Sequence, residues 1–297
     1  MILPGADYPA PAKLNLFLHV VGRRADGYHL LQSAFTLIDY SDRLRFRVRA
    51  DGVIARISGL PGVSAENDLT LRAASALRLA TGTRLGCDIE LDKRIPMGGG
   101  LGGGSSDAAT TLLVLNDLWK TGLTRRELQT LALPLGADVP FFIFGRNALA
   151  EGVGEVLQAI DLPQLVYLVL TPSVGVPTAQ IFKHPNLTRD TNPLRMADFS
   201  ASALLPLLAR LKNDLEPVVA ASFAQVAEYL EALNAVSQES FFARGGKSSR
   251  MTGSGGCVFA PFESEQAAQE AQRRLPDTIR GFIAKGLNQH PLLALSR

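Results

Sequence analysis

Cysteine is scarce in this chain, with only Cys87 and Cys257 among 297 residues. The two lie far apart in the sequence and form no CxxC pair, so the sequence predicts neither a disulfide framework nor a zinc site. A chain with few thiols and no such pattern is typical of a reducing compartment. We therefore expect a cytoplasmic protein.

The chain also lacks a strong excess of charge of either sign. Lys plus Arg number 30 and Asp plus Glu number 28, which gives a formal net charge of +2. Proteins dedicated to nucleic acid or to membrane surfaces carry clustered basic residues, so this balance argues against both kinds of partner. The apolar fraction of 46% is enough to build a packed core, and it argues against a disordered chain.

Long apolar runs and targeting segments are missing as well. A membrane-spanning helix needs about 18 consecutive apolar residues, whereas the best candidate, Val139–Phe144, is short and contains Pro140. Residues 1–11 contain three prolines and lack the basic-then-apolar order of a signal peptide. The sequence therefore predicts a soluble protein.

Two kinds of periodicity predict an α+β fold. Residues 14–20 alternate as a half-buried strand does, which puts Lys13 and Asn15 on the polar face. Residues 43–49 alternate arginine with apolar residues, as in a solvated sheet face. A change of pattern near residues 161–164 divides the chain into two domains. We expect these domains at 1–160 and 161–297, further strands at 87–91, 166–170, 257–262 and 279–285, and helices at 68–80, 105–119, from 124 onward, 201–211, 222–233 and 265–275.

The most informative segment is a glycine-rich run between a predicted strand and a predicted helix. Its backbone amides are almost free of side chains, and together with a helix N-terminus they can converge on a phosphate. Two serines at its end can add hydroxyl groups. We therefore expect the run to bind a polyphosphate. The run reads Pro96-Met97-Gly98-Gly99-Gly100-Leu101-Gly102-Gly103-Gly104-Ser105-Ser106.

Two other phosphate-binding motifs compete with this interpretation. A P-loop closes with Lys-Ser or Lys-Thr, and this run has no lysine, so a P-loop is excluded. The dinucleotide fingerprint GxGxxG matches at Gly98, Gly100 and Gly103. The acidic residue expected about twenty positions further on, at a strand end, is missing, because Asp117 lies within the predicted helix. A Rossmann-type dinucleotide-binding protein stays open as an alternative, and NAD(P) binding would test it.

The glycine run resembles the phosphate loop of the GHMP kinases, the family of galactokinase, homoserine kinase, mevalonate kinase and phosphomevalonate kinase. Pro11-Ala12-Lys13-Leu14-Asn15-Leu16 resembles the N-terminal motif of this family, and Met251-Thr252-Gly253-Ser254-Gly255-Gly256-Cys257 resembles its C-terminal glycine motif. The motifs occur in the family's order, from about residue 10 to about residue 285. The resemblance implies the two-domain α+β GHMP kinase fold, with the active site in the cleft between the domains.

The resemblance also implies roles for individual residues. Asp138, in Gly136-Ala137-Asp138-Val139-Pro140, would be the catalytic base. Lys13 would stabilise the negative charge that develops on the alkoxide and on the transferred phosphoryl group. The glycine run from Pro96 to Ser106 would bind ATP, together with Asn67 and Lys93. ATP, with Mg2+, is the implied cofactor, and no metal-ligating residue is assigned because no ligand cluster is evident in the sequence.

Two further segments are similar to one branch of the family, in which the acceptor is a cytidine diphosphate carrying methylerythritol. These segments are Asp26-Gly27-Tyr28-His29 and Pro177-Thr178-Ala179-Gln180-Ile181-Phe182. Tyr28 and Phe182 would stack on cytosine, and His29 would read the edge of the base. Asn15 and Thr178 would contact the sugar or the diphosphate. This branch serves the non-mevalonate route to isoprenoid precursors.

One residue departs from the pattern of that branch. Asparagine is common there at the position of Asp107, and the acid is interpreted either as a helix cap or as a Mg2+ ligand. A GHMP kinase for another small alcohol, such as homoserine or mevalonate, stays open. A non-catalytic nucleotide-binding module also stays open, although the presence of both Lys13 and Asp138 argues against it. The sequence does not decide between a monomer and a homodimer.

Overall fold

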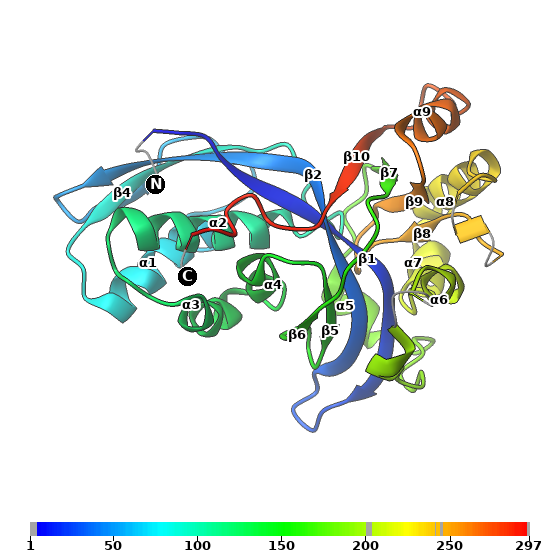
Figure 1. Ribbon diagram of the computed structural model, residues 1–297, viewed down its shortest axis with the longest axis horizontal. Helices are drawn as coiled ribbons and strands as arrows, with labels where there is room; N and C mark the ends of the chain where they lie inside the picture. Colours follow the sequence, from blue (N-terminus) through cyan, green and yellow to red (C-terminus); the bar gives the residue numbers. More distant parts are fainter. Residues whose placement is uncertain (1–4, 200–203, 241, 244–245, 296–297) are drawn as a thin grey trace.

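The computed structural model describes residues 5–199, 204–240, 242–243 and 246–295. It has two lobes, and the long antiparallel pair β1–β2 extends along both of them (Figure 1). The mixture of helices and strands confirms the predicted α+β class. The strands are β1 (Tyr8–Arg23), β2 (His29–Arg49), β3 (Ile54–Arg56), β4 (Gly86–Asp92), β5 (Ala148–Glu151), β6 (Val156–Ala159), β7 (Val166–Leu170), β8 (Arg250–Met251), β9 (Val258–Phe262) and β10 (Gly281–Leu287). The helices are α1 (Leu69–Thr81), α2 (Gly103–Leu118), α3 (Arg125–Ala132), α4 (Val139–Phe144), α5 (Thr178–Lys183), α6 (Leu204–Arg210), α7 (Glu216–Ser222), α8 (Ala224–Val236) and α9 (Glu265–Arg273).

The first lobe packs α1, α2, α3 and α4 against one face of the sheet that contains β1, β2 and β4 (Figure 1). Helix α2 lies at the centre of this packing, and nearly all of its residues are buried. Its alanine and leucine side chains supply apolar packing surface, and its buried polar side chains Thr111 and Asn116 donate hydrogen bonds to carbonyl oxygens. It begins at Gly103, two residues before the predicted start at residue 105, because Gly102 turns the chain with a φ of 72°.

Strand β1 differs from its predicted environment. Its alternation predicts one buried and one solvated face, and this prediction was wrong. Lys13 and Asn15 on the polar face are 3% and 2% exposed, and Leu14 on the other face is fully buried. Lys13 contacts Asp138 and lines a cavity with Asn15, whereas Leu14 belongs to an apolar cluster that includes second-lobe residues, so the alternation separates two interior surfaces of different chemistry.

The arginine-rich end of β2 is a solvated sheet face, as predicted. Arg45 pairs with Asp7 and Glu90, with N–O distances of 2.5 and 3.1 Å, and its side chain is 47% exposed. Arg47 pairs in the same way with Asp88 on the neighbouring strand β4. Cross-strand ion pairs on an exposed face contribute little to stability individually, and they explain the ladder without any ligand.

The second lobe is built on the strand order β10-β7-β9-β8, and it joins the first lobe through the sheet itself. Gly286 and Leu287 at the end of β10 pair with Ile38 and Leu37 of β2. The chain then returns to the first lobe, where the Arg125 guanidinium donates hydrogen bonds to carbonyl oxygens in the segment 293–295. The division of the chain at residue 160 stays a prediction.

Helices of the second half agree less well with their predicted bounds. The helix predicted at 222–233 corresponds to α8, which begins after Phe223, where the backbone is extended (φ −132°, ψ 94°), and the preceding helix α7 was not predicted. The helix predicted at 201–211 corresponds to α6, and its first three residues lie outside the described part of the chain. The short helices α4 and α5 were not predicted. None of the helices in the described residues has the length and apolarity that crossing a bilayer requires.

Candidate active site

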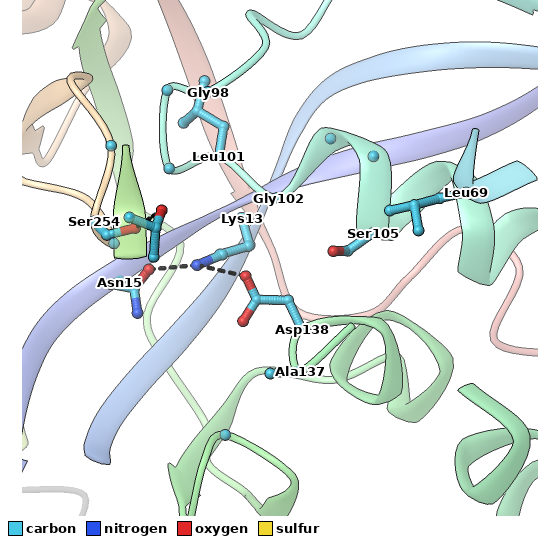
Figure 2. A pocket seen from close by; sticks show the side chains of 18 of the residues that line it. Lys13, Asn15, Leu69, Gly98, Leu101, Gly102, Ser105, Ala137, Asp138 and Ser254 are labelled. Carbon is cyan, nitrogen blue, oxygen red and sulfur yellow. Dashed lines mark hydrogen bonds and ion pairs between the residues drawn. The ribbon is translucent and has the colours of Figure 1, made fainter. Parts of the chain in front are cut away.

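A cavity of about 1070 Å³ lies where the two lobes meet. Its walls come from β1, the turn between β1 and β2, the glycine run, the start of α4, helix α5 and the segment 253–255. Figure 2 shows the part in which the glycine run, Lys13, Asp138 and Ser254 surround a common space. Elements from both halves of the chain therefore contribute residues to one cavity.

The glycine run packs tightly against a second glycine-rich segment. A Cβ atom on Gly100 would lie 2.1 Å from the carbonyl oxygen of Thr252, and one on Gly255 would lie 2.1 Å from the amide nitrogen of Gly100. The amide of Cys257 donates a 3.1 Å hydrogen bond to the carbonyl oxygen of Gly99. Gly100 and Gly255 are therefore required for contact between two backbones, and not only for approach to a ligand.

Other parts of the run remain available to a ligand. Gly98 and Gly104 are exposed, and Gly102 lies at the start of α2 with a φ of 72°. The residues from Pro96 to Ser105 all line the cavity. Ser106 differs, because its side chain is fully buried, it does not line the cavity, and its hydroxyl has no hydrogen-bond partner within the described residues. The structure therefore brings together every predicted member of this run except the Ser106 side chain.

Lys13 and Asp138 form an ion pair at the floor of the cavity. The Lys13 ammonium nitrogen lies 3.3 Å from Asp138 Oδ2 and 2.5 Å from Asn15 Oδ1 (Figure 2). Asp138 precedes α4 but makes no side-chain capping bond to that helix, which leaves its carboxylate free to face Lys13. The Asp138 side chain is 34% exposed, whereas that of Lys13 is 3% exposed. The pair thus offers an accessible carboxylate backed by a buried cation.

Asn15, which contacts Lys13 of this pair, is itself hydrogen-bonded to residues of both lobes. Its Nδ2 donates to Ser33 Oγ of β2 at 2.9 Å, and its backbone amide donates to Thr252 Oγ1 at 2.9 Å. The side-chain oxygen is then left to accept from Lys13. No individual role was predicted for Thr252 or Ser33 from the sequence. Thr252 lies within the C-terminal glycine motif and was identifiable as part of that motif, whereas no pattern marked Ser33.

Asp107 does not cap helix α2. Gly102 occupies the N-cap position, and Asp107 lies further along the helix, where it is buried. Its Oδ2 accepts a 2.9 Å hydrogen bond from the Lys93 ammonium, which also pairs with the buried carboxylate of Asp42. Burial raises the pKa of Asp107 to about 8, and the nearby charge of Asp42 adds to this rise while Lys93 opposes it. The interpretation of Asp107 as a helix cap was therefore wrong.

Asn67 and Lys93 both line the cavity on the α2 side. Asn67 is exposed, and its side-chain nitrogen donates to Ser64 Oγ at 3.1 Å. Lys93 is held by the carboxylates of Asp42 and Asp107. Their contacts with adenosine stay predictions. Within the described residues, no three His, Cys, Asp or Glu side chains are grouped closely enough to hold a metal ion.

The other end of the cavity carries the aromatic residues. Tyr28, in the turn between β1 and β2, is 64% exposed. The rings of His29 and Phe182 stack, with centroids 5.0 Å apart and an interplanar angle of 29°. Thr178 Oγ1 lies 2.7 Å from Ser254 Oγ, which ties α5 to the second glycine segment. The structure thus places all the predicted acceptor-binding residues on one cavity, while the sequence analysis gave Ser254 no role.

Comparison with known proteins agrees with this arrangement. Residues 68–146 match the GHMP kinases N terminal domain, and residues 199–281 match the GHMP kinases C terminal domain. A 4-diphosphocytidyl-2-C-methyl-D-erythritol kinase of Aromatoleum aromaticum is 54% identical over 97% of this chain and 95% of its own length. The kinase of the same name from Thiobacillus denitrificans is 55% identical over 96% of each chain.

Solved structures give the same result at the level of the fold. A crystal structure of 4-(cytidine 5'-diphospho)-2C-methyl-D-erythritol kinase, 36% identical in sequence, superposes with a TM-score of 0.78 over 95% of this chain and 99% of that chain. The mevalonate kinase of Methanococcus jannaschii superposes with a TM-score of 0.64 at 16% identity, over 96% of this chain and 99% of its own. The second likeness concerns the fold alone.

The contact between the glycine segments predicts a sharp response to one added methyl group. Gly255→Ala should reduce the free energy of unfolding by ~1–3 kcal/mol, because the new Cβ would overlap the backbone of Gly99 and Gly100. Urea unfolding followed by circular dichroism measures this change. Gly175→Ala is the matched control, because a Cβ there meets nothing within 4 Å. Equal stability of the two variants would contradict the proposed packing role.

The buried Asp107 predicts a specific pH dependence of stability. Its pKa is about 8 in the folded protein against an ordinary value of 3.8, so between these values the folded protein holds a proton that the unfolded chain has released. The resulting stabilisation is complete below the ordinary pKa and is lost as the pH rises through 8, by up to ~1.4 kcal/mol per pH unit. Asp107→Asn should therefore gain stability relative to the unmodified protein between pH 6 and pH 8.

Urea unfolding at both pH values tests this expectation. Asp117→Asn is the matched control, because it alters an exposed carboxylate on the same helix. Parallel stability curves for Asp107→Asn and the unmodified protein would show that Asp107 holds no extra proton in the folded state.

Proposed function

We propose that this chain, which belongs to the GHMP kinase family, transfers the γ-phosphoryl group of ATP to the 2-hydroxyl of 4-diphosphocytidyl-2-C-methyl-D-erythritol. The products would be the 2-phosphate and ADP, and the reaction would serve the non-mevalonate (methylerythritol phosphate) route to isoprenoid precursors. The chain is an ATP-dependent kinase, as its family and its kinase relatives show. Two relatives that are named as kinases of this acceptor are 54% and 55% identical in sequence to this chain and cover 97% and 98% of it.

The observation that carries the proposal is the Lys13–Asp138 pair beside a glycine run at the start of a helix. Phosphoryl transfer needs little covalent help from the protein, and it depends on positioning and on stabilisation of charge. The cavity combines a backbone-rich anion site with a carboxylate and an ammonium group 3.3 Å apart. Such an arrangement suits the transfer of phosphate to an alcohol.

In the proposed mechanism Asp138 is the base. Its accessible carboxylate would accept the proton of the 2-hydroxyl as the oxygen attacks the γ-phosphorus. Lys13 would hold Asp138 in place and would stabilise the negative charge on the attacking oxygen and the transferred phosphoryl group. Asn15 accepts from the ammonium of Lys13, and so fixes its direction without neutralising its charge.

The glycine run would hold the triphosphate through backbone amides and the positive end of α2. Mg2+ would accompany ATP and would neutralise phosphate charge. Magnesium usually binds through substrate phosphates and few protein groups, and this fits a cavity wall with the Ser105 hydroxyl at the start of α2. The carboxyl group of Asp107 lies in the same wall, but Lys93 already holds one of its oxygens and its raised pKa keeps it protonated at neutral pH.

The acceptor would lie with its base toward Tyr28, His29 and Phe182, because stacking on aromatic faces suits a flat pyrimidine. Its sugar and diphosphate would extend past Thr178 and Asn15 toward the Lys13–Asp138 pair. All of these residues line the cavity. Phosphate transfer to homoserine or mevalonate, measured beside transfer to the cytidylylated acceptor, separates this proposal from another member of the family.

We also propose that the protein works in the cytoplasm, as a monomer or a homodimer, without nucleic-acid or membrane partners. Its two cysteines are both free and buried, which supports a reducing compartment. The near balance of charge supports the lack of a polyanionic partner.

Replacement of the base tests the mechanism. Asp138→Asn should lower kcat by about 100- to 10,000-fold, since the amide cannot accept the proton, while both substrates still bind. A coupled assay of ADP release gives kcat, and calorimetry gives the two affinities. Asp161→Asn, at an exposed position outside the cavity, is the control. Full turnover by Asp138→Asn would remove the assignment of Asp138 as base.

Loss of a stacking ring should act on one substrate only. Tyr28→Ala should raise the KM for the cytidylylated acceptor by about 5- to 100-fold, which corresponds to the usual energy of base stacking, and should leave the KM for ATP unchanged. Ile57→Ala is a control of similar exposure, 61% against 64%, outside the cavity lining. An unchanged acceptor KM would exclude the stacking role.

A further inference from the structure

Arg189 lies behind the aromatic end of the cavity, and its guanidinium group donates four hydrogen bonds. Nε donates to His29 Nε2 at 3.2 Å, and Nη1 donates to the carbonyl oxygen of Leu187 at 3.0 Å. Nη2 donates to the carbonyl oxygens of Phe182 and His184 at 2.9 and 2.8 Å. No carboxylate of the described residues forms an ion pair with it. The group therefore holds one imidazole and three carbonyl oxygens.

The contact with His29 determines where the imidazole carries its hydrogen. A guanidinium can only donate hydrogen bonds, so His29 Nε2 must accept with its lone pair. Burial, Arg189 and Arg23 all lower the pKa of His29, which keeps the ring neutral. The hydrogen of a neutral ring then lies on Nδ1. Nδ1 has no protein partner among the described residues, and the ring lines the cavity.

We propose that Arg189 is a positioning residue that fixes His29 as a hydrogen-bond donor at Nδ1 and so makes the cavity select cytosine over uracil. This inference rests on the proposed function. Cytosine offers an unprotonated N3 on its pairing edge, whereas uracil carries a hydrogen there. A fixed donor on the protein matches the first base and opposes the second, and a mismatched buried donor discriminates strongly.

The same guanidinium also places the stacking ring. It binds the carbonyl oxygen of Phe182, whose ring stacks on His29. His29 begins β2, and Phe182 lies in α5 of the other lobe. One side chain thus sets both the hydrogen-bonding edge and the stacking face that a pyrimidine would meet. Arg189 itself does not line the cavity, so it acts through these two residues.

The test compares Arg189→Met, His29→Ala and the double variant with the unmodified protein. Arg189→Met should raise the KM for the cytidylylated acceptor at least about tenfold, with the KM for ATP unchanged. It should also lower the ratio of two kcat/KM values, that for the cytidine form of the acceptor divided by that for the uridine form, by a similar factor. In the His29→Ala background the same change should alter that ratio less than twofold, because Arg189 acts through His29.

The state of the imidazole gives a second, independent readout. The chain has four histidines, so the His29 ring signals are assigned by their loss in His29→Ala. Long-range 1H–15N spectra should show hydrogen on Nδ1 in the unmodified protein and a shift toward hydrogen on Nε2 in Arg189→Met. Arg195→Ala, which removes an exposed arginine outside the cavity lining, should change neither the ratio nor the spectra.

Two results would overturn the inference. One is an Arg189→Met variant that keeps its preference for cytidine and its Nδ1 hydrogen, even if it is less stable, because Arg189 would then only brace the backbone. The other is a hydrogen on Nε2 in the unmodified protein. Failure of the proposed function looks different, since the unmodified protein would then not phosphorylate the cytidylylated acceptor while the spectra still reported the ring.

Discussion

The close contact between two glycine segments is the constraint on which the rest of the site depends. The run at 98–104 and the segment at 253–256 come from opposite halves of the chain, and the atoms that meet are backbone atoms. Side chains at Gly100 or Gly255 would separate them. Because the segments touch, the amides that face the cavity on one side are held by the second lobe on the other. Glycine lowers stability through its freedom in the unfolded chain, but here the glycines allow the backbone contact that holds the run at 98–104 in place.

The buried ammonium of Lys13 depends on this arrangement. A cation removed from water is stable only when charge and hydrogen bonds compensate for its lost hydration. Asp138 supplies the charge and Asn15 supplies an oxygen, and Thr252 beside the second glycine segment in turn holds Asn15. The Lys13 ammonium is therefore held in a fixed position by the protein alone. Preorganised charge of this kind is what stabilises a transition state, since nothing has to reorient during the reaction.

Much of this could be predicted from local patterns, and the failures have a common cause. The apolar run at β7 and the capping box at Thr124 gave correct elements, because their signals lie within a few residues. The polar face of β1 was predicted to be solvated, because alternation cannot reveal the distant residues, such as Asp138 and Thr252, that contact it. Asp107 was interpreted as a cap or as a Mg2+ ligand, because local sequence does not reveal that its partner Lys93 comes from the segment after β4. In both of the wrong predictions, the environment of the side chain depends on residues from other segments of the chain.

The same distant contacts join the two ends of the cavity. Thr178 at the start of α5 meets Ser254, the neighbour of Gly255, and Gly255 packs on Gly100 of the phosphate loop. The wall that carries Phe182 is thus connected to the glycine run through one short segment of the second lobe. A cavity assembled in this way cannot place its aromatic wall independently of its glycine run. Under the proposed function, residues 253–256 would therefore set the distance between the base and the triphosphate, and this is a physical reason for two glycine clusters so far apart in the sequence.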